Sequence, residues 1–439
     1  MTARREGVRV AIAIDTSPGI AGGIVQSTQG LVMSLGELDG PEQYVLAART
    51  AAQAEWISRF RGPNQQIVVR DPRWRGPVDG GFLKRTLRPL VEDIRGIVGR
   101  LVPQTRWSSL PVSNGYYESL QCDVLHFPTQ GFTLCALPTV YNPHDLQYLH
   151  YPQFFTPDEL ARRETTYRAA CQLSHTIAVG SAWIKRDVVR QYAVGPEKIQ
   201  IIPWGSPTAH YPPIPTQDLK NADVRLGLPA SYALYPAVTW PHKNHLRLFD
   251  ALALLRDRRG IVVNLVCTGA RYEPHWPRVQ QRLKELELEP QVRFLGFLSE
   301  TDLRIVYRRS QFLILPTLFE ADSCPIHEAW SEDVPVASSC LTALPEQVGD
   351  AGLLFNATEV TAIADSIQKM TTDPDLRRDL VERGRRRVKD FDWTRTAKAY
   401  RAVYRRAAGL VLNEEDRWLL EWDWMKQPQR APGMADCYE

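Results

Sequence analysis

The chain has 439 residues, of which 44% are hydrophobic and 23% are charged, the balance of an ordinary folded protein with room for two domains. A formal net charge of +3 provides no global field for nucleic acid, so no nucleic-acid partner is expected. Its seven cysteines occur singly, and no apolar run is long enough to span a bilayer. These features exclude a zinc ribbon, a disulfide scaffold and a transmembrane protein, and they predict a cytoplasmic location.

The first half of the chain alternates strand-like apolar runs with segments of helical period, as α/β units around a parallel sheet do. The first strand is expected at Val8–Ile14, followed by a glycine turn with Gly22 and Gly23 and a helix through Leu31–Leu35. Further strands are expected at Tyr44–Ala47, Gln66–Val69, Val124–Phe127, Thr139–Tyr141, Thr176–Val179 and Ile199–Ile202. This pattern predicts a first α/β domain over residues 1–208.

An arginine-rich segment, residues 59–106, departs from this pattern. Its apolar residues follow helical spacing as far as Leu101, with Arg88, Arg95 and Arg100 among them. A basic amphipathic helix of this kind can lie on an anionic membrane, which would bring the protein to the inner face of a membrane. The favoured alternative is a helix that packs on its own domain and leaves a solvated basic edge.

Four prolines within residues 205–215 indicate a linker. The alternation then restarts, with a helix at Leu246–Leu255 and strands at Ala233–Pro236, Val262–Cys267, Val292–Leu295 and Phe312–Leu315. We therefore expect a second α/β domain over residues 209–405, followed by a C-terminal segment, residues 406–439. Three tryptophans within seven residues, Trp418, Trp422 and Trp424, predict that this segment packs back on the N-terminal domain rather than forming an exposed patch for a partner.

The last of these strands runs into a loop that carries Glu320 and then into a helix that begins near Pro325 and carries Glu328. Proline suits the first helical turn, and ligands bind at the carboxyl ends of parallel strands. Helix amides near Ser323 and Cys324 favour oxygen-rich groups, and carboxylates accept hydrogen bonds from sugar hydroxyls. From these residues alone, an acidic helix N-terminus with a purely structural role is an equal alternative.

The spacing of Glu320, Pro325 and Glu328 resembles the large family of retaining glycosyltransferases typified by bacterial mannosyl- and glucosyltransferases, family four of the usual classification. The similarity covers most of residues 230–405 and includes Val292–Leu298, Glu332–Ala337, Leu344–Glu346, Gly349–Phe355 and Phe391–Trp393. The resemblance implies the GT-B fold, in which two Rossmann-like domains face a central cleft. It also implies transfer of a sugar from a nucleoside-diphosphate sugar to a hydroxyl of a glycan, a lipid-linked saccharide or a small molecule.

The resemblance further implies a role for each matching residue. Glu320 and His144 are the implied catalytic residues, since the first orients the transferred sugar and the second contacts it. The implied donor-binding residues are Gly22, Gly23, Lys243, Gly269, Phe297, Leu298, Asp322, Ser323, Cys324 and Glu328. On the acceptor side, Asp145 binds the acceptor or orients its own loop, and His126 forms a wall of the acceptor pocket or is structural.

Lys243 lies just before a helix and can reach a diphosphate as a point charge. The family's usual arginine nearby is Val238 here, which leaves Arg247, His242 or main-chain amides to compensate. The chain has Ala-Asp-Ser-Cys after Glu320 where many members have Gly-Phe-Gly-Leu, so neither the sugar nor the nucleotide is assigned. No Asp-x-Asp follows a strand in the manner of metal-dependent transferases; we therefore expect no metal or other cofactor, and helix termini and the lysine to stabilise the leaving diphosphate.

Two other functions remain open. A sugar-nucleotide epimerase or a phosphorylase would keep the fold and need different acid–base residues. A non-catalytic, membrane-associated scaffold would use the basic segment 59–106. The joint presence of Glu320, Glu328, Lys243 and His144 argues against the scaffold.

Overall fold

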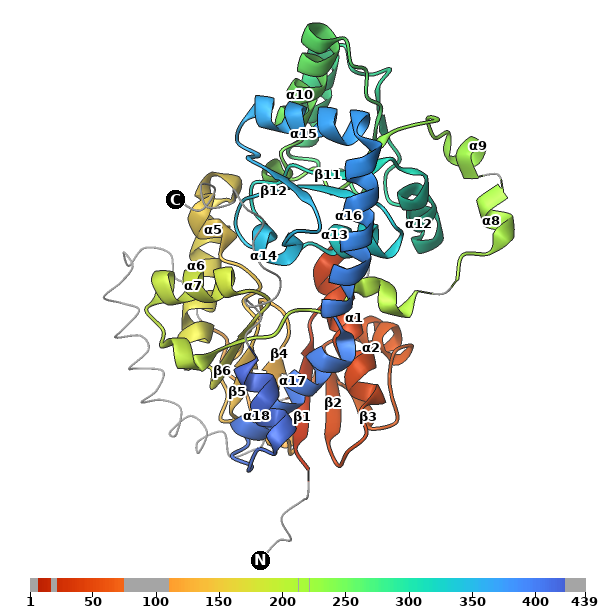
Figure 1. Ribbon diagram of the computed structural model, residues 1–439. Coiled ribbons are helices and arrows are strands. Elements are labelled where there is room, and N and C mark those ends of the chain that lie inside the picture. The colour runs from red at the N-terminus through yellow and green to blue at the C-terminus, as the bar shows by residue number, and fades with distance from the viewer. Residues whose placement is uncertain (1–6, 17–21, 75–109, 212, 221, 423–439) are drawn as a thin grey trace, which may run out of the picture. The chain divides into compact units, whose positions relative to one another are not determined.

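The computed structural model describes residues 7–16, 22–74, 110–211, 213–220 and 222–422 (Figure 1). These residues form two compact units. Unit 1 comprises the part up to Gly205 and the part from Trp393 onward, and unit 2 is the continuous stretch Ser206–Asp392. The basic helix expected around Arg88–Leu101 and the last of the C-terminal tryptophans lie outside the described residues.

Unit 1 contains a parallel seven-stranded sheet with the order β3-β2-β1-β4-β5-β6-β7. Its strands are β1 (Arg9–Ile14), β2 (Gln43–Ala48), β3 (Gln65–Val69), β4 (Val124–Phe127), β5 (Thr139–Tyr141), β6 (Thr176–Val179) and β7 (Ile199–Ile201). β1 pairs with β2 along its whole length, from Arg9 opposite Gln43 to Ile14 opposite Ala48, and with β4 from Val10 opposite Val124. The strand order reverses between β1 and β4, where open α/β sheets leave a crevice for ligands.

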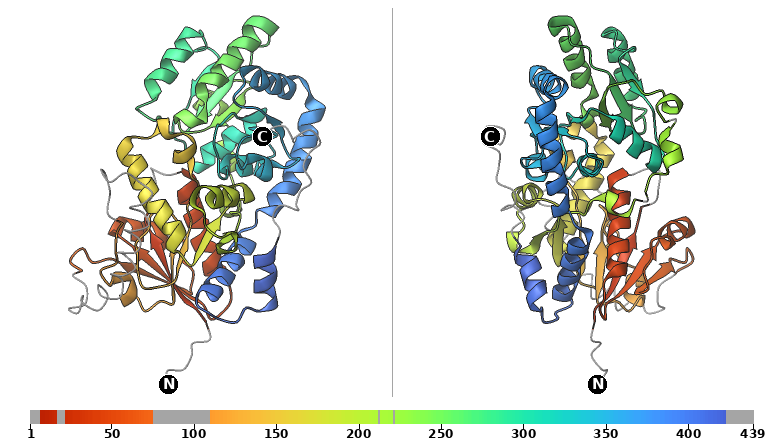
Figure 2. Two further views of the ribbon diagram at one scale, coloured as in Figure 1. Left: turned by 90° about the vertical axis from the view of Figure 1, so that its left-hand side faces the viewer. Right: turned by 45° about the vertical axis from the view of Figure 1, so that its right-hand side comes forward.

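Helices cover both faces of this sheet (Figures 1 and 2). They are α1 (Gly22–Glu37), α2 (Ala51–Ser58), α4 (Tyr116–Ser119), α5 (Gln147–His150), α6 (Pro157–Leu173), α7 (Ala182–Tyr192), α17 (Trp393–Ala407) and α18 (Glu414–Glu421), with the short 3-10 turns η1 (Pro152–Phe154) and η2 (Pro196–Lys198). The local sequence explains where they begin. At α6, Thr156 and Glu159 form a reciprocal capping box and proline takes the first helical position.

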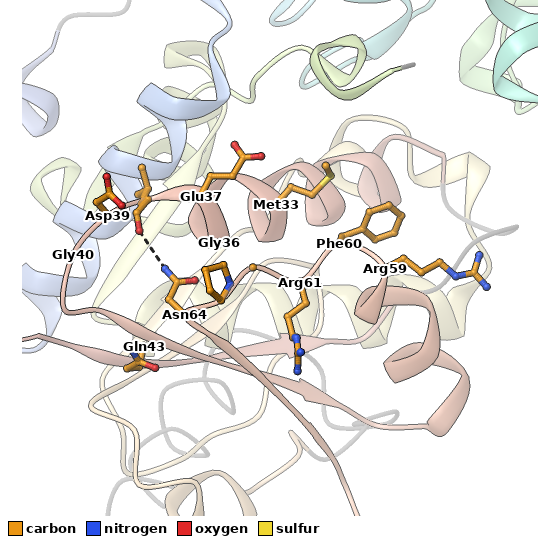
Figure 3. A pocket seen from close by; sticks show the side chains of 13 residues that line it. Met33, Gly36, Glu37, Asp39, Gly40, Gln43, Arg59, Phe60, Arg61 and Asn64 are labelled. Atoms are coloured by element: carbon orange, nitrogen blue, oxygen red, sulfur yellow. Dashed lines mark hydrogen bonds between the residues drawn. The ribbon is translucent and has the colours of Figure 1, made fainter. Parts of the chain in front are cut away.

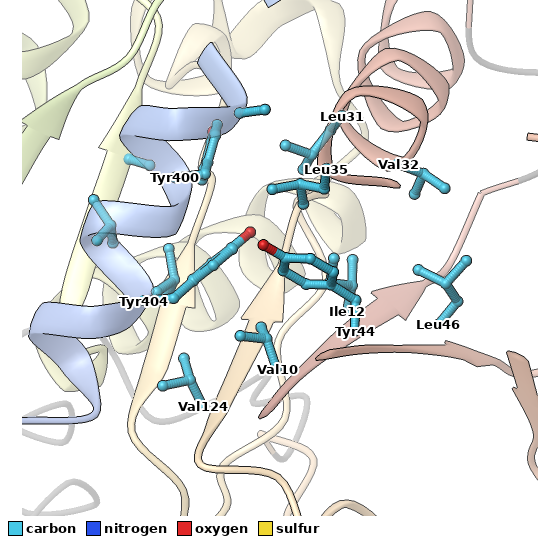
Figure 4. Packing of buried hydrophobic residues seen from close by; sticks show 14 of the residues in the cluster. Val10, Ile12, Leu31, Val32, Leu35, Tyr44, Leu46, Val124, Tyr400 and Tyr404 are labelled. Carbon is cyan, nitrogen blue, oxygen red and sulfur yellow. The ribbon is translucent and has the colours of Figure 1, made fainter. Parts of the chain in front are cut away.

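Helix α17 returns from the far end of the chain to complete the core of unit 1 (Figure 4). Tyr404 lies edge-on to Tyr44 of β2, with ring centroids 6.3 Å apart. A side chain at Gly30 of α1 would meet the Trp393 ring at 2.2 Å, so glycine is needed where α1 and α17 approach each other. The domain boundary expected at residue 405 therefore falls inside α17, a helix whose apolar face belongs to the first unit.

Unit 2 contains a parallel six-stranded sheet with the order β10-β9-β8-β11-β12-β13, the same winding as in unit 1. Its strands are β8 (Ala233–Pro236), β9 (Leu265–Thr268), β10 (Val292–Phe294), β11 (Phe312–Leu315), β12 (Val336–Ser339) and β13 (Leu353–Phe355). The order reverses between β8 and β11, which pair through Ala233 with Phe312 and Leu234 with Leu313. β9 begins at Leu265 rather than at the expected Val262, whose side chain is 62% exposed.

The helices of unit 2 lie on either side of its sheet (Figure 2). They are α8 (Thr216–Lys220), α9 (Ala222–Leu226), α10 (His245–Arg259), α11 (Trp276–Glu285), α12 (Glu300–Arg309), α13 (Cys324–Ser331), α14 (Leu344–Val348), α15 (Val360–Thr372) and α16 (Pro374–Arg387), with the turns η3 (Pro207–His210), η4 (Pro241–Lys243) and η5 (Val388–Asp390). The proline-rich segment expected as a linker is partly ordered, because η3 packs against α13. No helix among the described residues has the length and apolar character to cross a membrane.

Candidate active site

Two loops meet at the carboxyl ends of β8 and β11, the strands between which the second sheet reverses its order. Lys243 ends the turn η4 that follows β8, and Glu320 lies in the loop that follows β11. Lys243 Nζ donates to Glu320 Oε1 at 2.5 Å, with 17% and 11% of the two side chains exposed. Because the pair is mostly buried, solvent and salt screen it less than a surface ion pair.

Hydrogen bonds fix the backbone on both sides of this ion pair. Asn244 has a left-handed backbone with φ of 62°, and its side-chain amide donates to the Pro316 and Ala357 carbonyls at 2.9 Å each. The Glu320 amide donates to Thr342 Oγ1 at 3.0 Å, and that hydroxyl donates to the Glu320 carbonyl at 2.7 Å. Neither Asn244 nor Thr342 was predicted as a site residue. Of the two, only Asn244 has a recognisable sequence signal, because it is an asparagine directly before a helix.

The loop between the two glutamates is held by Gln347 of α14. The Ser323 amide donates to Gln347 Oε1 and to Asp322 Oδ1, both at 2.9 Å, and Gln347 Nε2 donates to the Ser323 carbonyl at 2.9 Å. The Ser323 amide, expected to meet a donor sugar, is therefore already engaged. Burial raises the pKa of the Asp322 carboxyl to about 7, with an opposing contribution from the Ser323 hydrogen bond and a smaller repulsion from Glu320. Near neutral pH this carboxyl is close to half protonated.

Glu328 lies in α13 and is only 5% exposed. The Tyr307 hydroxyl donates to its Oε2 at 2.7 Å, and the Tyr211 hydroxyl donates to its Oε1 at 3.3 Å. Neither tyrosine was predicted from the sequence, because each is separated from Glu328 by many residues in the chain. The carboxylate is thus satisfied by two phenols from different elements.

The remaining expected donor-binding residues of unit 2 lie at the same edge of the sheet. Gly269 follows β9 with φ of +105°, and a side chain there would meet the Ala237 backbone at 3.0 Å. Its amide donates to the Gly296 carbonyl at 2.8 Å, which joins the loops after β9 and β10. Phe297, 80% exposed, and Leu298 follow in the second of these loops. Phe297 therefore presents an aromatic ring to solvent at this edge.

Val238 occupies the position where the family usually has an arginine, and Arg247 is a positively charged side chain near this position. Arg247 Nη1 donates to Asn244 Oδ1 at 3.0 Å, so its guanidinium is held next to η4. His242 is buried, and burial, the Lys243 charge and His245 lower its pKa well below the usual range. His242 is therefore neutral and does not supply the positive charge considered from the sequence.

In unit 1, His144 and Asp145 lie in the loop after β5. His144 has φ of 59°, a left-handed conformation that few non-glycine residues adopt, and its Nε2 donates to the Pro128 carbonyl at 2.8 Å. Its ring stacks on Trp204 with centroids 6.0 Å apart, and burial lowers its pKa. The neutral ring therefore carries its proton on Nε2 and presents Nδ1 as an acceptor. Asp145 Oδ1 accepts the Gln147 amide at 3.0 Å, as expected of a residue that orients its loop.

His126 lies in the core of unit 1 rather than in the wall of an acceptor pocket. It is fully buried, its Nε2 bonds Asn142 Oδ1 at 2.6 Å, and its Nδ1 bonds the Tyr404 hydroxyl at 2.7 Å. Burial lowers its pKa to about 4. With both ring nitrogens engaged, His126 is structural. Gly22 and Gly23, by contrast, are exposed at the start of α1.

A separate pocket of about 650 Å³ lies in unit 1 at the amino ends of β2 and β3 (Figure 3). Met33 and Glu37 of α1 line one side, and Phe60, Arg61 and Asn64 line another (Figure 3). None of the site residues expected from the sequence lines it. Within the described part of the chain, no group of three or more His, Cys, Asp or Glu side chains is arranged to hold a metal ion.

Known proteins resemble the chain in sequence and in fold. Residues 222–387 match the family described as "Glycosyl transferases group 1". The O-antigen chain mannosyltransferase B of Escherichia coli is 27% identical over 267 residues, which are 59% of this chain and 69% of the relative. The MMP alpha-(1->4)-mannosyltransferase of Mycolicibacterium hassiacum is 29% identical over 305 residues, 67% of this chain and 70% of the relative. The crystal structure of Anabaena HepE with UDP and glucose aligns with a TM-score of 0.63 at 16% identity, over 89% of this chain and 97% of that one.

Proposed function

We propose that this chain transfers a hexose from a nucleoside-diphosphate sugar to a hydroxyl acceptor, with retention of the anomeric configuration and without a metal ion. The match of residues 222–387 to the group 1 glycosyl transferases and the GT-B fold support this proposal. The observation that carries this proposal is the Lys243–Glu320 ion pair at the switch point of the second sheet. The pair brings together an ammonium group that can bind a leaving diphosphate and a carboxylate that can accept hydrogen bonds from sugar hydroxyls.

When the donor binds, Lys243 and Glu320 separate and each contacts a group of the donor instead. The diphosphate takes the ammonium of Lys243, and Arg247 beside it adds charge of the same sign. Glu320 then accepts hydrogen bonds from the sugar hydroxyls and steadies positive charge on the ring. Because the ammonium is preorganised and partly shielded from water, it stabilises the charge that develops on the departing phosphate without reorganisation.

The transfer step needs no covalent nucleophile. The bond from the anomeric carbon to the phosphate oxygen breaks, and the acceptor oxygen forms the new bond on the same face. The acceptor's proton passes to the departing phosphate oxygen, which acts as the base. His144, whose Nδ1 is an acceptor, contacts the transferred sugar and helps to position it.

The names of the similar proteins support the substrate classes. One relative is an O-antigen chain mannosyltransferase, and one solved neighbour holds UDP and glucose. We therefore expect the donor to be a nucleotide sugar and the acceptor to be a glycan, free or lipid-linked, met in the cytoplasm. A lipid-linked acceptor would bring the basic segment 59–106 to the inner face of a membrane.

A thermal-shift screen of nucleoside diphosphates and their sugars in the presence of EDTA tests this proposal. We expect at least one nucleotide to raise the melting temperature of the full chain, and Lys243→Ala to abolish most of that increase. Lys284→Ala, on the exposed end of α11, is the matched control and should change nothing. If no nucleotide stabilises the wild type, or only in the presence of a divalent metal, the proposal is wrong. An epimerised or phosphorolytic product in place of a transferred sugar would also refute it.

A further inference from the structure

The carboxylate of Glu328 is shared by two phenols that differ in how firmly they are held. Tyr307 comes from α12, is fully buried, and donates at 2.7 Å. Tyr211 comes from the segment after η3, is only partly buried, and donates at 3.3 Å. The shorter bond from the more buried group identifies Tyr307 as the fixed partner.

The segment that carries Tyr211 is anchored at its start. The Ser206 amide donates to the Phe391 carbonyl at 2.9 Å, and Thr208 Oγ1 donates to Ser331 Oγ of α13 at 2.6 Å. Tyr211 follows these anchors, and its own amide donates to the Thr208 carbonyl at 3.1 Å, so a rotation of its side chain would leave η3 in place on α13. The Arg304 guanidinium lies over the ring, 5.6 Å from its centroid.

A buried carboxylate needs hydrogen-bond donors in every state of the protein, because an unpaired buried charge is strongly destabilising. A carboxylate is an acceptor only, and the hydroxyl of a sugar is chemically close to a phenol as a donor. A ribose hydroxyl can therefore replace the weaker of the two phenols on Glu328 without leaving the charge unpaired. Such an exchange keeps the number of hydrogen bonds to the carboxylate constant.

We propose that Tyr211 is a placeholder for the donor ribose on Glu328 and that Tyr307 is the positioning residue that holds the other carboxylate oxygen. In the absence of donor, the Tyr211 hydroxyl satisfies Oε1. When the nucleotide binds, a ribose hydroxyl takes that bond and the tyrosine moves aside. This inference rests on the proposed function and on the contact between the donor's ribose and Glu328 that the resemblance to the glycosyltransferase family implies.

The two tyrosines then have opposite effects on nucleotide selection. The probe is the nucleoside diphosphate that most stabilises the wild type in the screen above, compared with its 2′-deoxy and 3′-deoxy forms by calorimetric titration of the full chain. Tyr211→Phe removes the competitor, so the preference for the ribose form should rise about tenfold, the effect of one hydrogen bond to a charged group. Tyr307→Phe frees the carboxylate to turn, so the preference should fall by a similar factor. Glu328→Gln should also reduce it.

Tyr148→Phe is the control, because that hydroxyl also donates to a carboxylate, Glu164 Oε2 at 2.5 Å, but in unit 1. It should leave the preference unchanged. A purely structural role for Tyr211 predicts the same preference in Tyr211→Phe as in the wild type, and that result would overturn the placeholder. A wild type that binds ribose and both deoxy forms equally would overturn it too, while leaving the phosphate site intact. A wild type that binds no nucleotide overturns the proposed function itself.

Discussion

Asp322→Asn is the substitution whose effect can be worked out most directly from the structure. Burial raises the pKa of this carboxyl to about 7 from an ordinary value of 3.8. An asparagine has nearly the same shape, and its side-chain oxygen can still accept the Ser323 amide, now at 2.9 Å from the aspartate. The substitution therefore removes the ionisable group and keeps the local hydrogen bond.

The sign follows from proton binding. Between about pH 4 and pH 7 the folded protein keeps a proton on Asp322 that the unfolded chain has released, so the stability of the wild type falls as pH rises through this window. Each pKa unit corresponds to about 1.4 kcal/mol, so a shift of about three units sets a ceiling of roughly 4 kcal/mol on that loss. The free energy of unfolding of Asp322→Asn should exceed that of the wild type by little near pH 4. This difference should grow toward the ceiling by about pH 7 and then stay constant.

Urea unfolding of both proteins, measured at intervals between about pH 4 and pH 8, gives this difference directly. Asp375→Asn, in which the replaced side chain is 80% exposed on α16, is the control and should show little dependence on pH. An advantage of Asp322→Asn that is equal at all pH values would refute the argument, because it would mean that the aspartate is ionised in the folded protein throughout.

Three further substitutions test the structure and the site. Gly30→Ala forces a methyl group against Trp393 and should destabilise unit 1 by about 1–3 kcal/mol in urea unfolding; an unchanged midpoint would contradict the tight packing of α1 on α17. Tyr404→Phe leaves His126 Nδ1 unpaired in the core and should destabilise the protein by about 1–3 kcal/mol, with nucleotide affinity in calorimetry unaltered; a loss of affinity would return His126 to the binding site. His144→Asn keeps a residue that tolerates the left-handed backbone and should reduce the rate of sugar transfer at least about tenfold at unchanged nucleotide affinity, and an unimpaired rate would exclude a contact with the sugar.

The sequence predicted local features more accurately than contacts between distant segments. The strands at Val124–Phe127 and Phe312–Leu315 have the expected bounds, because each is a short apolar run flanked by turn residues. The positions of Lys243 and Glu320 after neighbouring strands followed from the family pattern, but their direct ion pair did not. It depends on strand order, which the spacing of residues along the chain does not encode.

The hydrogen-bond partners of Glu328 could not be predicted from the sequence for the same reason. Tyr211 and Tyr307 reach Glu328 from elements far from it in sequence, and neither lies in a motif. Tyrosines at helical spacing ordinarily indicate core packing, so nothing in the residue pattern distinguishes these two from the rest. The buried position of His126 agrees with the structural alternative that the sequence left open, since a polar residue at a strand end can serve a core hydrogen-bond network as well as a ligand.

The insertion of unit 2 between two parts of unit 1 has a consequence for biosynthesis. The ribosome finishes the sheet of unit 1 early, yet α17, which supplies Trp393, Tyr400 and Tyr404 to that core, emerges only after the whole of unit 2. All residues of unit 2 have therefore been synthesised before unit 1 is complete. Until α17 emerges, the apolar face of the first sheet that this helix covers stays exposed. A ribosome stalled when Asp392 has left the exit tunnel and α17 is still inside it should therefore carry a protease-resistant second unit and a protease-sensitive first one.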